Sequence, residues 1–284
     1  LTVGNFSLLD VFDDNTLAHD PRTGFLNWSF MTHAAYDYAA DARGYGWGAA
    51  GEWFAGDWVL RAARMTVPRE PNQLRLDYQV FRHYGDQAEV EHAHVFAGQP
   101  GRLRLLAWRN RGVLARFDDA IALGAATRAT PDINAVRTSI RTKTGLGINF
   151  EQAVSADVGL FARAMWADGA TETQSFTEAD RSLSGGAVWR GGRWGRAQDS
   201  VGVALAANAL SAQRRRYLEA GGISYFIGDG ALRYRPEQIV EAYYSVAVAS
   251  KAWVTADVQR IANPAYNADR GPAWFWGLRV HAEF

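Results

Sequence analysis

Several charged side chains of this chain occur in pairs two residues apart. Glu89 and Glu91 form one pair, and Arg102 and Arg104 form another. Residues i and i+2 of a β-strand point to the same face, so each pair would present two like charges on one surface. Guanidinium groups donate hydrogen bonds and carboxylates accept them. A surface with both groups can exchange hydrogen bonds with the hydroxyls of sugars, and it needs no catalytic group to do so.

More charged residues occupy similar positions in other segments that resemble strands. These further candidates for the lining of a water-filled passage are Glu52, Arg163, Glu241, Asp257 and Arg279. A passage for polar solutes needs polar groups that replace part of the solute's hydration shell. The alternative is structural, because inward charges also solvate a wall and join strands through cross-strand ion pairs. For any single residue the structural interpretation is the simpler one.

Segment 10–44 is the longest stretch without a strand pattern. It combines Asp residues with Arg22 and Arg43 and with the aromatic residues Trp28 and Tyr38. Segments of this length usually fold on themselves or carry function. We predict that the segment narrows the passage, with both arginines donating to solute hydroxyls. The two aromatic rings would then stack against the C–H faces of a sugar.

The chain offers little for metal binding. The run Asp13–Asn15 with Asp20 could supply oxygen ligands to Ca²⁺, but its spacing is not that of an EF-hand. His92 and His94 lie two residues apart on one strand, and no third ligand is evident. We therefore predict no metal site and no cofactor.

Two other motifs leave alternatives open. The run Arg214–Arg216 could clamp a phosphate or lipopolysaccharide, or it could form a solvated loop surface. Ser182 or Ser184 with a histidine could serve an enzyme that acts on lipid, but no motif joins them. Cysteine is absent, which excludes disulfides, thiolate metal sites and cysteine nucleophiles. The prediction is that the protein is not an enzyme.

The elements that must position these residues are β-strands. Short turns and long polar loops alternate between them, as they do in transmembrane barrels. The long connections are 10–44, 68–85, 113–142, 169–180, 211–236 and 263–272. The predicted strands are 2–9, 45–54, 58–67, 86–97, 102–112, 143–154, 158–168, 181–190, 199–210, 237–248, 252–262 and 273–284.

Most of these strands alternate between an apolar face and a face with charge, Gly or Ser. In 273–284, Trp276, Leu278 and Val280 share one face, and Arg279 lies on the other. Lipid outside and water inside produce this pattern. By the same alternation, Arg at Leu205 should destabilise the barrel, whereas Arg at Ala206 should mainly alter the passage. Aromatic residues at strand ends match interfacial girdles: Tyr45, Trp47, Trp53, Trp58, Trp166, Trp189, Trp253, Trp274 and Trp276.

Two strands fit the pattern less well. Arg61 and Arg64 face the same passage only if strand 58–67 contains a bulge. In strand 86–97, His92 and His94 share the face of Val90, so Glu89 and Glu91 take the other face, or the register is shifted by one residue. Within the loops, 118–126 and 213–220 are the segments most like helix.

Composition excludes several classes of protein. The formal net charge is +0, so no overall field attracts nucleic acid. No segment approaches the roughly 18–20 apolar residues of a membrane-spanning helix. The chain is rich in Gly and Trp, and its lysines are Lys143 and Lys251. These features are unusual for a soluble enzyme.

An even number of strands places both termini on the side of the short turns. Phe284 ends an alternating apolar strand, and the outer-membrane assembly machinery recognises such an end in known barrels. We therefore predict that Phe284 is an assembly signal. The N-terminus lacks the pattern of a signal peptide, and we expect a signal peptide and further chain to precede Leu1.

Long strings of this sequence resemble the carbohydrate-selective porins of the OprB family, over nearly the whole chain. The strings are Asp10–Asn15, Ala18–Thr23, Phe25–Trp28, Asp37–Tyr45, Tyr217–Gly222, Gly228–Gly230, Tyr234–Glu237, Glu241–Tyr244, Asp257, Gln259–Asn267 and Asp269–Pro272. The resemblance implies an all-β, antiparallel transmembrane β-barrel of sixteen strands in the outer membrane of a Gram-negative bacterium. About twelve strands are visible here, so either the N-terminal strands of the family barrel are absent or this is a smaller closed barrel.

The resemblance also implies a function. A single barrel domain over residues 1–284 would act as a porin for passive diffusion of small hydrophilic solutes, with sugars as the expected class. Its expected partners are sugars, outer-membrane lipid and lipopolysaccharide, the assembly machinery and a second copy in a homo-oligomer. The alternatives are a barrel enzyme that acts on lipid, and a structural or adhesive barrel.

Overall fold

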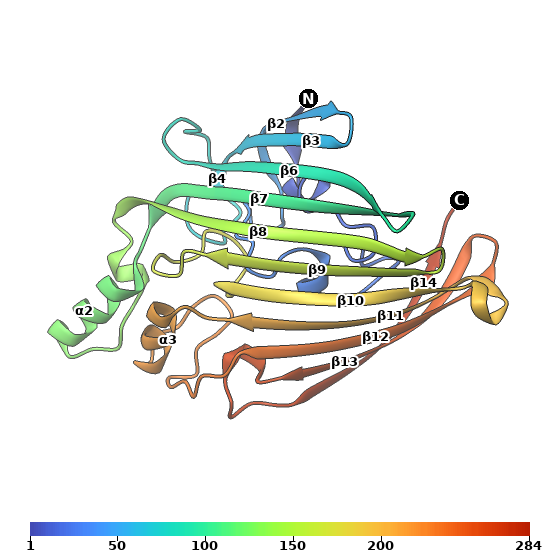
Figure 1. The fold of residues 1–284 in the computed structure, drawn as a ribbon. Coiled ribbons are helices and arrows are strands. Elements are labelled where there is room, and N and C mark those ends of the chain that lie inside the picture. Colours follow the sequence, from blue (N-terminus) through green and yellow to red (C-terminus); the bar gives the residue numbers. More distant parts are fainter.

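The protein forms one strongly curved antiparallel sheet, which Figure 1 shows from its outer side. The structure is a computed structural model, and it describes residues 1–284. The sheet has 12 strands, and each pairs with its neighbours in chain order. They are β1 Thr2–Phe6, β2 Gly46–Ala55, β3 Trp58–Met65, β6 Tyr84–Phe96, β7 Gln99–Leu114, β8 Ser139–Ser155, β9 Val158–Ala167, β10 Arg181–Gly191, β11 Arg196–Ala209, β12 Glu237–Ala249, β13 Ala252–Ala262 and β14 Ala273–Ala282.

All twelve predicted strands are confirmed, with shifts of a few residues at their ends. β1 stops at Phe6 because the Ser7 side chain accepts a hydrogen bond from Leu9 N and caps a 3-10 helix at Leu8–Asp10. β14 stops at Ala282, so Phe284 lies beyond the strand and is fully exposed. A separate two-stranded sheet, β4 (Val67–Pro68) and β5 (Leu76–Asp77), is too short to leave a sequence pattern.

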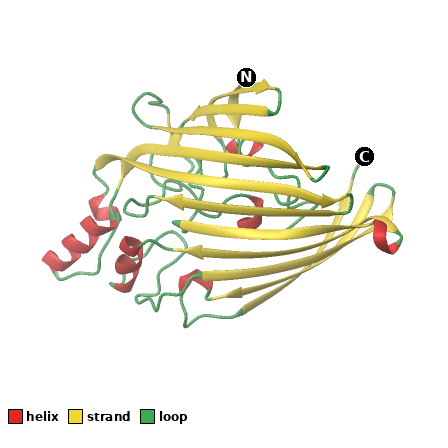
Figure 2. Ribbon diagram, viewed as in Figure 1, coloured by secondary structure: helices red, strands yellow, loops and turns green.

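The two ends of the sheet differ. Tight turns at 56–57, 97–98, 156–157, 192–195 and 250–251 lie at one end, called the short-turn end here. Long connections lie at the other, the long-loop end, where Figure 2 shows the two longest helices. These are α2 Phe117–Thr127 and α3 Ala212–Glu219, which confirm the helical predictions. No helix combines the length and the apolar character needed to cross a membrane.

The remaining helices are short. α1 (Trp28–Met31) lies in segment 10–44, and 3-10 turns occupy Asn134–Val136, Gly192–Trp194 and Pro264–Tyr266. Asn27 begins α1, and its side chain accepts a hydrogen bond from Ser29 N. Segment 10–44 is therefore locally ordered, although most of it has no regular secondary structure.

The outer face of the sheet is apolar, and the inner face carries most of the charged side chains of the wall, as predicted, together with buried apolar residues. Leu205 on β11 is 60% exposed, whereas its neighbour Ala206 is 6% exposed. Successive residues of a strand point to opposite faces, and this produces the difference. Large apolar side chains are exposed along the outer face: Trp47, Trp53, Trp58, Leu60, Val90, Leu105, Leu146, Ile148, Leu160, Trp166, Leu183, Val203, Val240, Trp274, Trp276, Leu278 and Val280.

Strand β3 contains no bulge, so Arg61 and Arg64 do not both face the passage, as the sequence pattern requires. The pairing of β3 with both neighbours runs without a register shift from Trp58 to Met65. Arg61 faces inward, and Arg64, three residues later, faces outward near the strand end. A bulge is unnecessary because the two arginines have separate roles.

The pattern of β6 is confirmed in its predicted register. Glu89 and Glu91 are buried on the inner face, and Val90 is exposed on the outer face. His92 packs against Trp58, with ring centroids 4.3 Å apart, and His94 lies 6.1 Å from His92. The two histidines therefore pack along the outer face of the sheet.

The apolar core lies between the inner face of the sheet and the long connections. A cluster of 24 buried residues combines Phe12 and Tyr36 of segment 10–44 with wall residues such as Trp108 and Met165. A smaller cluster of 8 packs Ala206 with residues that include Phe25 and Phe30. Ala206 thus faces inward, but protein fills the space in front of it, so we expect Arg there to destabilise the fold as well as alter the passage.

Candidate permeation site

Segment 10–44 runs along the inner face of the sheet, and Figure 1 shows this blue segment within the curve of the strands. It takes the form of a long loop between β1 and β2. Its contacts reach wall strands from β6 to β14, as described below. The loop therefore occupies the concave side of the curved sheet.

The strongest attachment of the loop is a buried group around Asp13. Arg163 on β9 donates from Nε to Asp13 Oδ1 at 3.1 Å and from Nη1 to Phe30 O at 2.8 Å. Thr32 Oγ1 donates to Asp13 Oδ2 at 2.7 Å, and Asn149 on β8 also donates to this carboxylate. Phe30 takes part through its backbone carbonyl, and the other residues take part through polar side chains. The side chains of Asp13 and Arg163 are almost fully buried.

Charge within this group is fixed by its surroundings. Burial opposes ionisation of Asp13, yet Arg163, His33 and the hydrogen bonds from Thr32 and His33 hold its pKa at about 2. His33 Nε2 lies 3.3 Å from Asp13 Oδ1. Burial lowers the pKa of His33 to about 4, with Asp13 acting against the shift and Arg163 adding to it. At neutral pH the group therefore contains an ionised Asp, an Arg and a neutral His.

A second attachment joins the loop to the last strands. Glu241 on β12 accepts hydrogen bonds from Leu26 N at 2.5 Å and Asn27 N at 2.9 Å. Arg279 on β14 donates to Pro21 O at 2.6 Å and Gly24 O at 2.8 Å. These two wall residues bind backbone atoms of the loop. They therefore fix the path of the loop backbone and leave the loop side chains unconstrained by these bonds.

The third attachment lies toward the long-loop end. The carboxylate of Asp37 accepts from Gln174 N at 2.8 Å and Ser175 N at 2.7 Å, both in the β9–β10 connection. Burial raises the pKa of Asp37 to about 6, although Lys143 and these two N–H groups act in the other direction. Loop 10–44 is thereby joined to another long connection as well as to the wall.

A ladder of alternating charges crosses the first half of the inner wall. Arg61 on β3 bonds Glu52 at 3.0 Å, Glu89 at 2.9 Å and Glu91 at 2.8 Å. Arg104 on β7 continues it, at 2.9 Å from Glu91. Glu151 on β8 follows, at 3.3 Å from Arg104 and 3.5 Å from Arg102. Loop backbone joins the ladder too, because Glu89 accepts from Asp13 N and Glu151 from Thr16 N.

The predicted wall residues differ in how far the loop and their neighbours bury them. Glu89, Glu91, Arg104, Arg163 and Glu241 face inward but are buried, as is Asp257 on β13. Arg279 is partly buried beneath the loop. Glu52 and Arg102 keep larger exposed fractions, 31% and 42% of their side chains.

The predicted loop residues lie at different ends of the sheet. Arg22 pairs with Asp20 at 2.8 Å and is 77% exposed toward the short-turn end. Arg43 pairs with Asp41 at 2.7 Å, next to the β3–β6 connection at the long-loop end. The structure does not bring these two arginines together, contrary to their predicted common role. Sequence position could not show this, because the loop passes along the sheet between them.

Trp28 and Tyr38, in contrast, line one cavity. It has a volume of about 480 Å³ and lies between the loop and the long connections. Tyr38 stacks on Phe176 with ring centroids 4.7 Å apart, and Trp28 is 43% exposed. The cavity is lined by Leu9, Trp28, Met31, Thr32, His33, Tyr36, Tyr38, Phe176, Thr177, Glu178, Phe226, Ile227, Glu237, Ala265 and Tyr266. We call it the aromatic chamber.

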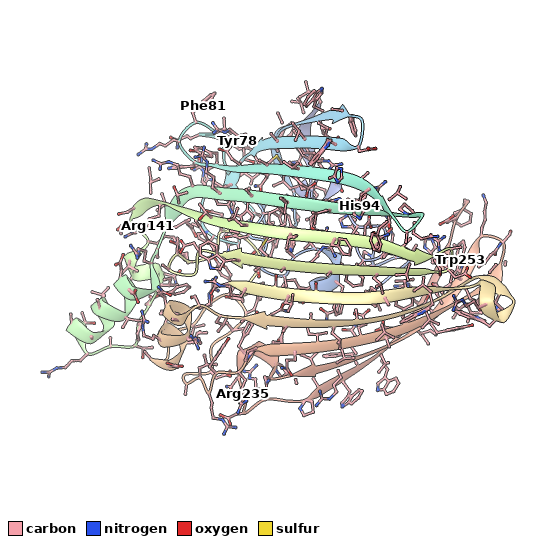
Figure 3. All side chains as sticks on the ribbon, in the orientation of Figure 1. Tyr78, Phe81, His94, Arg141, Arg235 and Trp253 are labelled. Atoms are coloured by element: carbon pink, nitrogen blue, oxygen red, sulfur yellow. The ribbon has the colours of Figure 1, made fainter.

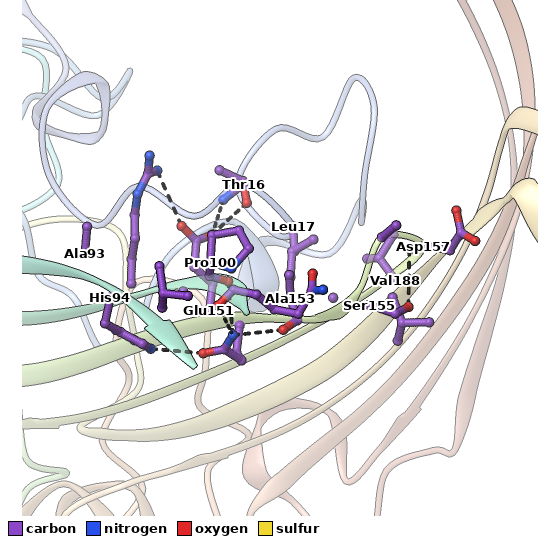
Figure 4. A pocket seen from close by; sticks show the side chains of 18 of the residues that line it. Thr16, Leu17, Ala93, His94, Pro100, Glu151, Ala153, Ser155, Asp157 and Val188 are labelled. Atoms are coloured by element: carbon purple, nitrogen blue, oxygen red, sulfur yellow. Dashed lines mark hydrogen bonds and ion pairs between the residues drawn. The ribbon is translucent and has the colours of Figure 1, made fainter. Parts of the chain in front are cut away.

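Cavities with more charge lie at the short-turn side of the loop. One of about 550 Å³ is bordered by Thr16, Leu17, Arg102 and Glu151, and Figure 4 shows Thr16 bonded to Glu151 within it. Another of about 380 Å³ is lined by Arg22, Thr23, Arg190, Ser200, Ser245, Trp253, Thr255, His281 and Glu283. These two cavities are called the charged chambers. Fixed loop 10–44 separates them from the aromatic chamber.

Other proposed sites take different roles in the structure. The Asp13 carboxylate is bonded by protein donors, so it is not free for Ca²⁺. Arg214 is buried, with Glu178 at 2.5 Å and Asp180 at 3.1 Å, so both the phosphate clamp and the solvated surface are wrong for it. Ser182 faces inward and accepts a hydrogen bond from Ala35 N at 3.3 Å, away from lipid.

Sequence reasoning missed Asp13, His33 and Asp37 as anchors of the loop. All three lie in the segment singled out for its length, but nothing in their spacing identifies partners more than 100 residues away. Asp13 and Asp37 are buried because the loop packs against the strands, and this packing cannot be derived from local sequence. Alternation did identify the wall side of those contacts.

An antiparallel sheet with an apolar outer face, a polar inner face and a loop fixed inside it defines the class of β-barrel pore proteins. A sequence model described as "Carbohydrate-selective porin, OprB family" matches residues 1–284. The chain belongs to the OprB family of carbohydrate-selective porins. It is an outer-membrane porin of the Gram-negative type, and its fold and family are those of a channel rather than an enzyme.

A solved structure supports the fold. A high-pH structure of Pseudomonas putida OprB is similar to this chain with a TM-score of 0.78 at 18% sequence identity, over 99% of this chain and 69% of that one. The Pseudomonas putida toluene transporter TodX has a TM-score of 0.32 at 11% identity, over 79% of this chain and 69% of that one. No curated protein sequence matches the chain. In a Gram-negative outer membrane the long-loop end is extracellular and the short-turn end periplasmic.

Proposed function

We propose that sugars cross this porin by passing loop 10–44 between the aromatic chamber and the charged chambers. The observation that carries the proposal is the position of the fixed loop, with cavities of different chemistry on its two sides. An extracellular solute meets aromatic rings first. It then meets exposed charges, among them Arg22 and Arg102.

The chemistry of the two sides suits a sugar. Its C–H faces pack against rings such as Trp28 and Tyr38, and its hydroxyls exchange hydrogen bonds with guanidinium and carboxylate groups. Each contact must be weak, because a solute that binds tightly does not leave. Buried residues such as Arg163 and Glu241 act on selectivity indirectly, since they hold the loop.

Single-channel recording tests the aromatic side of this route. Trp28→Ala should weaken the block of ion current by a monosaccharide about three- to tenfold, because a stacking surface is lost. Trp53→Ala is the matched control, since Trp53 is exposed on the outer face. Arg22→Ala tests the charged side and should raise ion conductance while reducing the block. Unchanged block in both Trp28→Ala and Arg22→Ala would place the route elsewhere.

We also infer that Phe284 serves as an assembly signal for the barrel. β14 alternates apolar and polar residues up to Ala282, and Phe284 is fully exposed beyond it. Its deletion should lower the amount of heat-modifiable protein in the outer membrane while total synthesis stays the same. Phe284→Ala should have the same effect, whereas Glu283→Gln should have little. Normal insertion of the deletion variant would contradict the role.

A further inference from the structure

The outer face of the sheet carries a group of arginines at its extracellular end. Arg64 on β3 and Arg109 and Arg111 on β7 alternate with inward residues and point away from the lumen. Arg64 lies 2.7 Å and Arg109 2.8 Å from one carboxylate, that of Asp86 on β6. Two guanidinium groups thus share a single carboxylate, and Arg111 adds a third cation two residues along β7, so the group is positively charged.

An aromatic ring holds this group in place. The guanidinium of Arg64 lies 4.1 Å from the centroid of Tyr84, and that of Arg109 lies 5.4 Å from it. Arg111 is the cross-strand partner of Tyr84. Cation–π contact and the Asp86 bonds restrict the guanidinium planes while the side chains stay 39% and 51% exposed for Arg64 and Arg109. These groups are oriented, and they still have donors that face away from the protein.

The group lies at the boundary of the apolar surface. The next outward residues toward the periplasm are apolar, and they include Leu60, Val90 and Leu105. Beside the group, the β5–β6 connection exposes Tyr78 and Phe81, which are 64% and 88% exposed and project from the molecule in Figure 3. Cations next to exposed aromatic rings at this level match the junction between lipid headgroups and acyl chains.

The same arrangement recurs along the extracellular rim. Arg181 on β10 lies 4.8 Å from the ring of Trp166, and Arg260 on β13 lies 6.0 Å from that of Trp274. All four residues are on the outer face near the extracellular ends of their strands. The cluster at Tyr84 is the densest part of this arginine belt.

We propose that Arg64, Arg109 and Arg111 bind the phosphate groups of lipopolysaccharide in the outer leaflet. Asp86 takes the Nε and Nη2 donors of Arg64 and Arg109, which leaves their Nη1 donors for phosphate oxygens. Together with the guanidinium of Arg111, they match a lipid with more than one phosphate. Tyr78 and Phe81 would contact the adjoining acyl chains. This inference rests on the orientation of the barrel in the outer membrane and is independent of the route that sugars take.

Binding of purified lipid tests the proposal. The protein is prepared in detergent free of lipopolysaccharide and titrated with bis-phosphorylated lipid A, with dephosphorylated lipid A, and with inorganic phosphate. Binding is followed by native mass spectrometry. The test variant is R109Q/R111Q. The control is R193Q/K251Q, which removes two cations that are exposed at periplasmic turns.

The proposal expects bis-phosphorylated lipid A to bind R109Q/R111Q about tenfold or more weakly than the unsubstituted protein, because charge-assisted bonds are lost. The control should bind normally, and both variants should keep their single-channel conductance. Equal binding by the two variants, equal binding of dephosphorylated lipid, or full competition by millimolar phosphate would overturn it. If R109Q/R111Q does not fold, salt dependence decides: lipid binding to the unsubstituted protein that is unaffected by raised NaCl also overturns it.

Discussion

The two faces of the same strands use arginine in opposite ways. On the inner face, Arg163 is buried, and its donors reach a carboxylate and loop carbonyl groups. On the outer face, Arg109 is half exposed and lies against the ring of Tyr84. The inner residue has donors that the protein itself satisfies, so it fixes a structure. The outer residue keeps donors available to a ligand.

This difference follows from what surrounds each face. Inside the sheet, loop 10–44 supplies acceptors from its backbone and from Asp13, and water is largely displaced. A buried charge must be paired, because an unpaired one costs several kcal/mol. Outside, the rim meets headgroups and water, where an ion pair contributes little to stability. An arginine's effect on folding is therefore set by the face it occupies.

Removal of Arg163 gives the largest expected effect. Arg163→Met leaves Asp13 buried without its cation, and we expect a loss of about 3–5 kcal/mol in unfolding free energy. Release of the loop should also raise single-channel conductance. The matched variant Arg109→Met should cost about 1 kcal/mol or less in lipopolysaccharide-free detergent. Equal destabilisation by the two variants would break the comparison between the faces, and D13N/R163M should recover part of the loss.

A pair of substitutions on β11 sharpens the same comparison. Leu205→Arg places a charge on the lipid face and should cost about 2–4 kcal/mol near the midplane of a bilayer, without a change in conductance. Ala206→Arg instead forces a large side chain into the cluster of Phe25 and Phe30, which should cost about 1–3 kcal/mol and displace the loop. Conductance should therefore change in Ala206→Arg alone. A conductance change in Leu205→Arg would contradict the assignment of faces.

The smallest effect at neutral pH is expected at His33. Its pKa is about 4 in the folded protein, below its ordinary value of 6.5, so its contribution to stability is present above pH 6.5 and is lost as pH falls through 4. Protonation would place a cation beside Arg163, although Asp13, with a pKa of about 2, stays ionised. Asp37, with a pKa raised to about 6, acts in the opposite direction.

Conductance recorded between pH 7 and pH 4 tests this expectation. It should rise on acidification as loop 10–44 loosens. His33→Gln should behave as the unsubstituted protein does at pH 7 and respond less to acid. An equal response of both proteins to acid would assign the change to other titratable groups.

Local patterns in the sequence are enough for the strands, because alternation and turns are properties of neighbouring residues. They place Glu89, Glu91 and Arg104 correctly on the inner face. They also place Arg61 and Arg64 on opposite faces unless the strand contains a bulge. Arg64 needs no place in the passage, because it lies at the rim, where the outer face also meets headgroups and water.

The attachments of the loop could not be predicted in the same way. Alternation shows that Arg163 and Glu241 face inward, but it does not show which atoms of residues 13–33 they meet. These contacts join residues 150 and 215 positions apart. A pairing of this kind depends on the curvature of the whole sheet and on the path of a loop with little regular structure. A single sequence carries no local signal for either.

The span of these attachments has a consequence for the order of folding. Arg279 on the last strand donates to Pro21, a separation of 258 residues, and Glu241 reaches back to Leu26 over nearly the same length. Loop 10–44 is thus synthesised well before the strands that hold it, and it reaches its final position only after them. Contacts so distant in sequence form slowly. The attachment of loop 10–44 to the last strands is therefore a late event in the maturation of the barrel, completed only after β14 has joined its neighbour.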